Sequence, residues 1–103
     1  MVPFYSLDTV RQIAQDVRKI FLSRLARRDS SNLGYGIQDI AACIIDLKES
    51  DFLNTKNYNG VVMDAYKIAY EGLACHLDDL YIKLRVTSDN QVVISVGSFH
   101  ISW

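Results

Sequence analysis

The sequence predicts an α+β fold in which helices cover one face of an antiparallel β-sheet. Apolar residues recur at helical spacing only in the first half of the chain, up to about residue 47. Apolar and polar residues alternate through most of residues 61–96, and residues 88–90 have the composition of a turn between two strands. Helices first and hairpin strands last favour a sheet with one face packed on helices and the other face open to a ligand or partner.

The N-terminal part of the chain predicts one clear helix followed by weaker elements. A helix is expected over about 7–17, with Ser6 in front of it as a cap. Residues 20–22 predict either a short strand or a continuation of that helix, and residues 23–28 are rich in helix formers. Residues 29–36 combine Asp, Ser, Asn and Gly, so a loop is expected there.

The middle and the end of the chain predict a second helix and then the sheet. An apolar stripe at helical spacing predicts a helix that packs against the sheet, and its members are Ile37, Ile40, Ala41, Ile44 and Leu47. Residues 54–60 are rich in Asn and end in glycine, so we expect a loop. Residues 61–70 predict a strand, and residues 80–87 with 91–96 predict a hairpin with one buried face.

Length and composition predict one globular domain over residues 1–103. Apolar residues make up 50% of the chain and charged residues 22%, which is unlike the composition of disordered chains. The longest apolar run, residues 40–45, is far shorter than the roughly 20 residues of a membrane helix, so we expect a cytoplasmic protein without membrane contact. Cys43 and Cys75 lack CxxC spacing and are expected to be reduced core thiols.

The net charge of −1 argues against a strong, sequence-independent attraction to nucleic acid. Its distribution is uneven, because residues 1–30 hold six bases and three acids whereas residues 37–52 hold four acids and one base. The basic N-terminal third is either a solvated helix face or a partner surface.

Motifs of the large enzyme classes are absent from the sequence. There is no glycine-rich phosphate loop, nucleophile elbow or HExxH helix. Cys43, Cys75, His76 and His100 could supply four zinc ligands by number, but their spacing is not that of a metal site. We therefore expect neither a metal nor a small-molecule cofactor.

The outward face of the predicted hairpin is the strongest candidate for binding. Tyr81, Lys83 and Arg85 follow one another at two-residue spacing, and Tyr66 and Lys67 lie on the preceding strand. Aromatic rings stack on bases while Lys and Arg bind phosphates, a combination typical of single-stranded RNA recognition. A solvated sheet face has the same composition, so both interpretations stand.

Three segments resemble the MqsR toxin family of bacterial toxin–antitoxin modules. They are residues 42–52 (Ala-Cys-Ile-Ile-Asp-Leu-Lys-Glu-Ser-Asp-Phe), 63–66 (Met-Asp-Ala-Tyr) and 80–84 (Leu-Tyr-Ile-Lys-Leu). The resemblance implies a RelE-like fold and a ribosome-independent endoribonuclease that cleaves single-stranded mRNA without a metal and is neutralised by an antitoxin protein. RNA carries its own nucleophile in the 2′-OH, so a base, an acid and a cation are sufficient for cleavage.

The resemblance also implies roles for individual residues. Tyr81 stands at the position of the family's catalytic tyrosine and Lys67 at that of its arginine, with Tyr66 and Asp64 beside it on the same strand. Lys83 and Arg85 complete the expected substrate-binding set with Lys67 and Tyr66.

Several family positions are replaced in this sequence. Leu53 and Asn54 stand where the family has Tyr-Lys, and Met63 stands where it has a functional Gln. The lysine of the family's last strand corresponds either to Gly97 or to His100. A histidine can transfer a proton near neutral pH, whereas a glycine cannot.

Lys56, in the predicted loop, could restore the charge lost at the replaced lysine position. The expected catalytic set is therefore Tyr81, His100 and Lys56. The alternative is a catalytically impaired member of the family that binds only antitoxin or RNA, and a third possibility is an unrelated α+β interaction domain.

Overall fold

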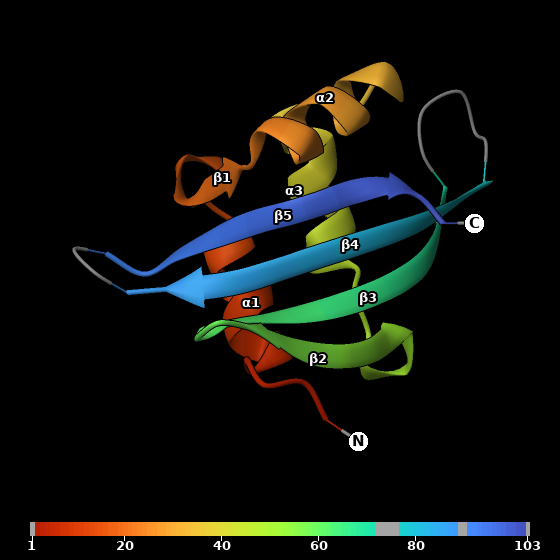
Figure 1. Ribbon diagram of the computed structural model, residues 1–103. Coiled ribbons are helices and arrows are strands. Elements are labelled where there is room, and N and C mark those ends of the chain that lie inside the picture. Colours follow the sequence, from red (N-terminus) through yellow and green to blue (C-terminus); the bar gives the residue numbers. More distant parts are fainter. Residues whose placement is uncertain (1, 72–76, 89–90, 103) are drawn as a thin grey trace.

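The computed structural model describes residues 2–71, 77–88 and 91–102 and confirms the predicted α+β fold (Figure 1). One sheet has the strand order β1-β5-β4-β3-β2. The elements in chain order are α1 (Leu7–Ala14), the short 3₁₀ helix η1 (Val17–Lys19), β1 (Ile20–Leu22), α2 (Arg24–Asn32), α3 (Ile37–Ile45), the 3₁₀ helix η2 (Glu49–Asp51), β2 (Phe52–Tyr58), β3 (Val61–Glu71), β4 (Leu77–Thr87) and β5 (Val93–Ile101). Among the described residues, no helix is both long and apolar enough to span a membrane.

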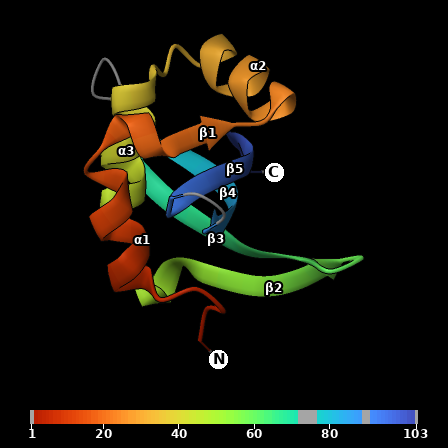
Figure 2. The same ribbon diagram turned by 90° about the vertical axis from the view of Figure 1, so that its left-hand side faces the viewer.

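The sheet is antiparallel except at one edge, where β1 pairs in parallel with β5. The helices α1 and α3 lie together on one side of the sheet and leave its other face open (Figure 2). The predicted apolar stripe is confirmed, since Ile40, Ala41, Ile44 and Leu47 are buried against the strands. The inward residues Leu80, Ile82 and Leu84 of β4 form the opposite side of this core.

The loop predicted at residues 54–60 is wrong, because most of this segment is strand β2. The turn itself is only Asn59-Gly60, whose φ angles of 55° and 93° are typical of a tight hairpin turn. The side chain of Asn57 accepts a hydrogen bond from the Gly60 N–H at 2.6 Å. Asn59 therefore forms the turn itself, and the side chain of Asn57 stabilises it. The backbone N–H and C=O groups of the residues before the turn are satisfied by pairing with β3.

Two helix boundaries also differ from the prediction. The first helix ends at Ala14 and is followed by η1, which Asp16 caps by accepting a hydrogen bond from the Arg18 N–H at 3.0 Å. The loop predicted from residue 29 is wrong in its first part, because α2 continues to Asn32. Ser30 is buried in this part of the helix, and its hydroxyl is satisfied there because it donates to the Arg27 carbonyl at 3.2 Å.

A buried carboxylate holds the N-terminal segment against the sheet. Asp64 on β3 has no exposed surface, and it accepts hydrogen bonds from the Phe4 N–H at 3.0 Å and from the Tyr5 N–H at 2.8 Å. The hydroxyl of Thr55 on β2 also donates to Asp64. Asp64 therefore connects β2, β3 and the start of the chain from the core side of the sheet.

Cys43 is buried on α3, as predicted, whereas Cys75 lies outside the described residues. Burial raises the pKa of the Cys43 thiol to about 12. An exposed thiol has a pKa of ~8.5, so the unfolded chain releases this proton at lower pH than the folded chain does. The Cys43 contribution to stability is therefore complete at neutral pH and is lost as the pH rises toward 12.

Cys75→Ser leaves Cys43 as the single thiol of the chain. The linkage predicts that the free energy of unfolding of this variant falls between pH 8 and about 9.5, as measured by urea unfolding followed by circular dichroism. The same experiment on Cys43→Ala, Cys75→Ser is the control, because it lacks the titrating thiol. The pH range lies below the titration of ordinary tyrosines at ~10. An equal pH dependence in the two proteins would contradict the prediction.

Candidate functional site

The open face of the sheet carries most of the residues singled out from the sequence. Side chains alternate along each strand, so the odd-numbered residues of β3 and β4 lie on the face opposite the helices. The cations of this face, within the part of the chain that the structure describes, are Lys56, Lys67, Lys83 and Arg85. Its acids, Glu71 and Asp79, lie toward one end of the strands. The near-neutral net charge thus conceals a locally cationic surface.

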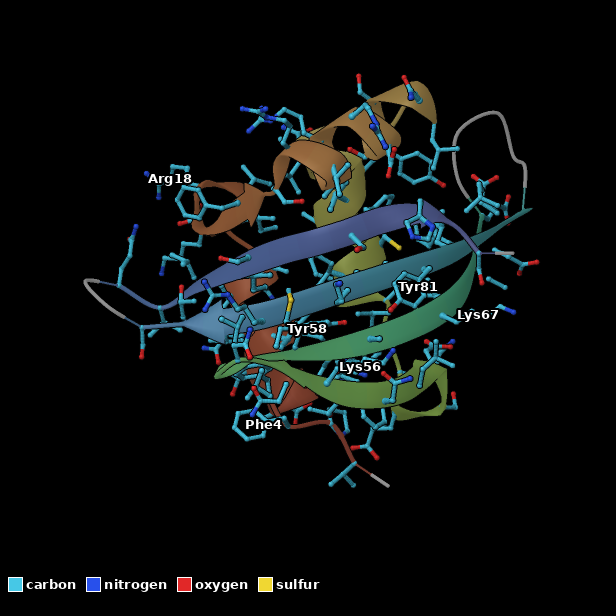
Figure 3. All side chains as sticks on the ribbon, viewed as in Figure 1. Phe4, Arg18, Lys56, Tyr58, Lys67 and Tyr81 are labelled. Atoms are coloured by element: carbon cyan, nitrogen blue, oxygen red, sulfur yellow. The ribbon has the colours of Figure 1, made fainter. Side chains whose placement is uncertain are left out.

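Three candidate residues form a row across neighbouring strands. Tyr81 on β4 lies opposite Lys67 on β3 and opposite His100 on β5. The rings of Tyr81 and His100 are stacked, with centroids 5.1 Å apart and planes inclined by 17°. Figure 3 shows Lys67 and Tyr81 close together on the open face. This row brings a phenol, an imidazole and an ammonium group together on an accessible surface.

The backbone beside His100 orders its imidazole. Nδ1 of His100 lies 2.8 Å from the carbonyl oxygen of Ile101. A carbonyl can only accept, so this hydrogen bond requires the proton on Nδ1 and leaves the lone pair of the neutral ring on Nε2. An imidazole in this tautomer can take a proton through Nε2.

Lys83 points toward β2 and contacts a tyrosine that the sequence analysis missed. Its ammonium lies 3.4 Å from the hydroxyl of Tyr58 and 4.7 Å from the centroid of that ring. Tyr58 is exposed at the end of β2. The alternation of Asn54, Lys56 and Tyr58 is the signal in the sequence for this strand face, but the turn preference of asparagine favours a loop over the same residues.

Lys56 lies on β2 rather than on a flexible loop, and the structure does not bring it beside Tyr81. It pairs with Met63, which is four residues before Lys67 on β3. At about 3.3 Å per residue, this offset is roughly 13 Å along the strand direction. Lys56 therefore belongs to the cationic surface but lies apart from Tyr81 (Figure 3).

Tyr66 does not lie on the open face, which corrects its place in the expected substrate-binding set. The residue is completely buried on the core face, and its ring meets that of Phe52 at a centroid distance of 5.7 Å. Burial raises the pKa of its phenol, so the group stays neutral. Adjacent residues on a strand face opposite sides, and Tyr66 is therefore a core residue while Lys67 is exposed.

The structure separates the two candidate positions for the last-strand lysine. The pairing of β4 with β5 shifts register between Lys83 and Leu84, which leaves Gly97 as an extra residue, a β-bulge. A Cβ atom at Gly97 would lie 2.7 Å from the Cε atom of Met63. His100 therefore lies beside Tyr81, whereas Gly97 lies beneath Met63.

This close approach predicts that Gly97→Ala destabilises the protein by only about 0.5 kcal/mol, because the new methyl group displaces the flexible end of the Met63 side chain. The cost is expected to fall in a Met63→Ala background, where the clashing atoms are absent. Urea unfolding of the two single variants and the double variant measures the coupling. Equal costs of Gly97→Ala in both backgrounds would contradict the proposed contact.

Ser23, the N-cap residue of helix α2, fixes the helix to this bulge. Ser23 caps the helix by accepting from the Ala26 N–H at 3.0 Å, and its hydroxyl donates to the Gly97 carbonyl at 2.9 Å. Its own N–H donates to the Val96 carbonyl, also at 2.9 Å. These bonds place α2 along the C-terminal half of β5, next to His100.

The described residues contain no group of three or more His, Cys, Asp or Glu side chains that could hold a metal ion. Cys75 and His76, two members of the scattered zinc set considered above, lie outside the described residues.

The fold and the site define a small α+β protein with one helix-covered sheet face and one open face that presents cations and aromatic rings. A family model described as "Motility quorum-sensing regulator, toxin of MqsA" matches residues 2–100. The chain therefore belongs to the MqsR toxin family, as its sequence motifs indicated. It is a toxin of a toxin–antitoxin system, and this family implies an antitoxin partner. No curated protein gives a significant match to the sequence.

Proposed function

We propose that the protein is an endoribonuclease that cleaves single-stranded mRNA, independently of the ribosome, by acid and base catalysis from its own side chains. The observation that carries the proposal is the stacked pair of Tyr81 and His100 with Lys67 alongside on the open sheet face. Family membership adds the expectation of a toxic activity that an antitoxin restrains.

In the proposed reaction, Nε2 of His100 removes the proton from a ribose 2′-OH, and the 2′-oxygen attacks the adjacent phosphorus. The bond from phosphorus to the 5′-oxygen breaks, and the hydroxyl of Tyr81 donates a proton to that leaving oxygen. The products are a 2′,3′-cyclic phosphate and a free 5′-OH. Lys67 stabilises the negative charge that develops on the phosphoryl oxygens.

The remaining cations of the open face hold the RNA strand in this proposal. Lys83 and Arg85 continue the β4 row away from Tyr81, and Lys56 lies on β2, on the other side of β3 from that row. The exposed ring of Tyr58 next to the Lys83 ammonium supplies a surface on which a base can stack.

The test is to incubate purified protein, free of antitoxin, with end-labelled single-stranded RNA in excess chelator. We expect fragments that end in a 2′,3′-cyclic phosphate, and we expect no cut on the 3′ side of a nucleotide that carries 2′-deoxyribose. The absence of cleavage, together with normal growth when the protein is expressed without antitoxin, would refute the enzymatic proposal.

A second candidate function is binding without cleavage, and the surroundings of Met63 favour it. Met63 stands where the family has a functional Gln, and its thioether end fills the space above Gly97. Such a protein would bind antitoxin or RNA through the same face. RNA binding in a fluorescence anisotropy titration, together with no cleavage in the assay above, would support this function over the first.

A further inference from the structure

A pocket of about 430 Å³ opens between helix α2 and the C-terminal half of β5. It exists because β1 pairs only with residues 94–96 of β5, so that α2 rather than a strand lies beyond Val96 (Figure 1). His100 lines this pocket and also stacks on Tyr81. His100 is therefore both a wall of the pocket and a member of the proposed catalytic pair.

The lining of the pocket combines apolar walls with a polar rim. Leu25, Leu33 and Ile101 supply aliphatic surface from both sides. Flat aromatic ligands commonly bind between such walls, with a few polar groups that fix their orientation. A single nucleobase is a ligand of this kind.

The polar rim has a defined donor and acceptor arrangement. The carboxylate of Asp29 accepts from the guanidinium of Arg28, at 3.1 Å from Nε and 3.0 Å from Nη2. Asn32, one helical turn further along α2, also lines the pocket. Both contacts end on the same oxygen, Oδ1, and a carboxylate with remaining acceptor capacity selects ligands that present N–H groups.

We propose that this pocket binds one base of the RNA substrate next to the scissile phosphate, and that Asp29 selects a base with an exocyclic amino group. The proposal rests on the proposed ribonuclease function, since it takes RNA as the ligand. Adenine, cytosine and guanine each carry such an amino group, whereas uracil carries only carbonyl acceptors and one ring N–H. Asp29 is a specificity residue in this scheme and takes no part in proton transfer.

The experiment measures binding rather than cleavage. Fluorescent 2′-O-methyl oligonucleotides of cytidine, adenosine or uridine cannot be cleaved through the 2′-oxygen, and their affinities follow from fluorescence anisotropy. We expect the cytidine and adenosine oligomers to bind about tenfold more tightly than the uridine oligomer, as one charge-assisted hydrogen bond provides. Asp29→Ala is expected to remove this preference.

Two variants keep the test specific. Asp8→Ala is the matched control, because Asp8 also pairs with an arginine on a helix, at 3.1 Å from Arg11, but lies on α1 away from the pocket. It should keep the preference. Leu25→Trp, which fills the pocket from the exposed side of α2, should weaken binding of the cytidine and adenosine oligomers to the level of uridine.

The outcomes separate the inference from the proposed function. Equal affinities for the three oligomers, or a preference that survives in both pocket variants, would overturn the base pocket whether or not RNA is cleaved. A preference that Asp29→Ala and Leu25→Trp both remove would support the pocket, even if the chelator assay detected no cleavage. Circular dichroism of each variant checks that the fold is retained.

Discussion

Replacing His100 by alanine is expected to lower the rate of RNA cleavage by about 10²- to 10⁴-fold, the usual contribution of a general acid or base. The proposed reaction needs a group that accepts the 2′-OH proton, and His100 is the imidazole beside Tyr81. The substitution also removes one ring of the stacked pair. The measurement is single-turnover cleavage of end-labelled RNA at saturating protein.

Tyr81→Phe tests the other member of the pair, because it keeps the ring that stacks on His100 and removes only the hydroxyl. We expect a loss of similar size, and we expect the double variant to be little slower than either single variant, since the two groups act in one step. Tyr70→Phe is the matched control: it removes a phenol hydroxyl from the core-facing row of β3. It should cleave RNA at the rate of the parent protein.

Full activity in Tyr81→Phe and His100→Ala would refute the assignment of these residues, while leaving the family membership intact. Loss of activity with loss of the folded circular dichroism spectrum would identify a structural role instead. Unchanged RNA affinity with slow cleavage would place the effect in the chemical step.

The sequence predicted strands β3 and β4 and helix α3 well, because their signals are local. The alternation along residues 80–87 and the stripe from Ile37 to Leu47 each depend only on neighbouring residues, and the structure confirms both. The prediction was wrong over β2, where the local preference of Asn for turns competes with pairing to β3. Propensity alone cannot decide that competition.

The site was predicted less well, because strand register determines it. The sequence does not specify that Tyr81 lies opposite Lys67 and His100, or that Lys56 lies opposite Met63. Tyr66 is the exception, because the sequence alone indicates its place. A residue next to Lys67 on a strand must face the other side of the sheet, so Tyr66 and Lys67 cannot both lie on the open face. Arg28 and Asp29 line the pocket beside His100 because α2 packs along β5, and this is a contact between distant parts of the chain.

The second large effect concerns Asp64, the buried carboxylate within the MqsR-like segment of residues 63–66. Asp64→Ala is expected to lower the free energy of unfolding by roughly 3 kcal/mol. The substitution removes the acceptor of two backbone N–H groups, those of Phe4 and Tyr5, and of the Thr55 hydroxyl. Water can satisfy these donors only if the N-terminal segment leaves the sheet.

Urea unfolding measures the total loss, and hydrogen exchange of the Phe4 and Tyr5 amides locates it. Both amides should be protected in the parent protein and exchange rapidly in Asp64→Ala, whereas amides of the β4 core should keep their protection. Asp79→Ala removes an exposed carboxylate from the neighbouring strand and is expected to change stability by less than about 0.5 kcal/mol. Asp64→Asn retains one acceptor oxygen, so its loss in the free energy of unfolding should lie between those of Asp64→Ala and Asp79→Ala. Rapid exchange of Phe4 and Tyr5 in the parent protein would show that Asp64 does not hold this segment in solution.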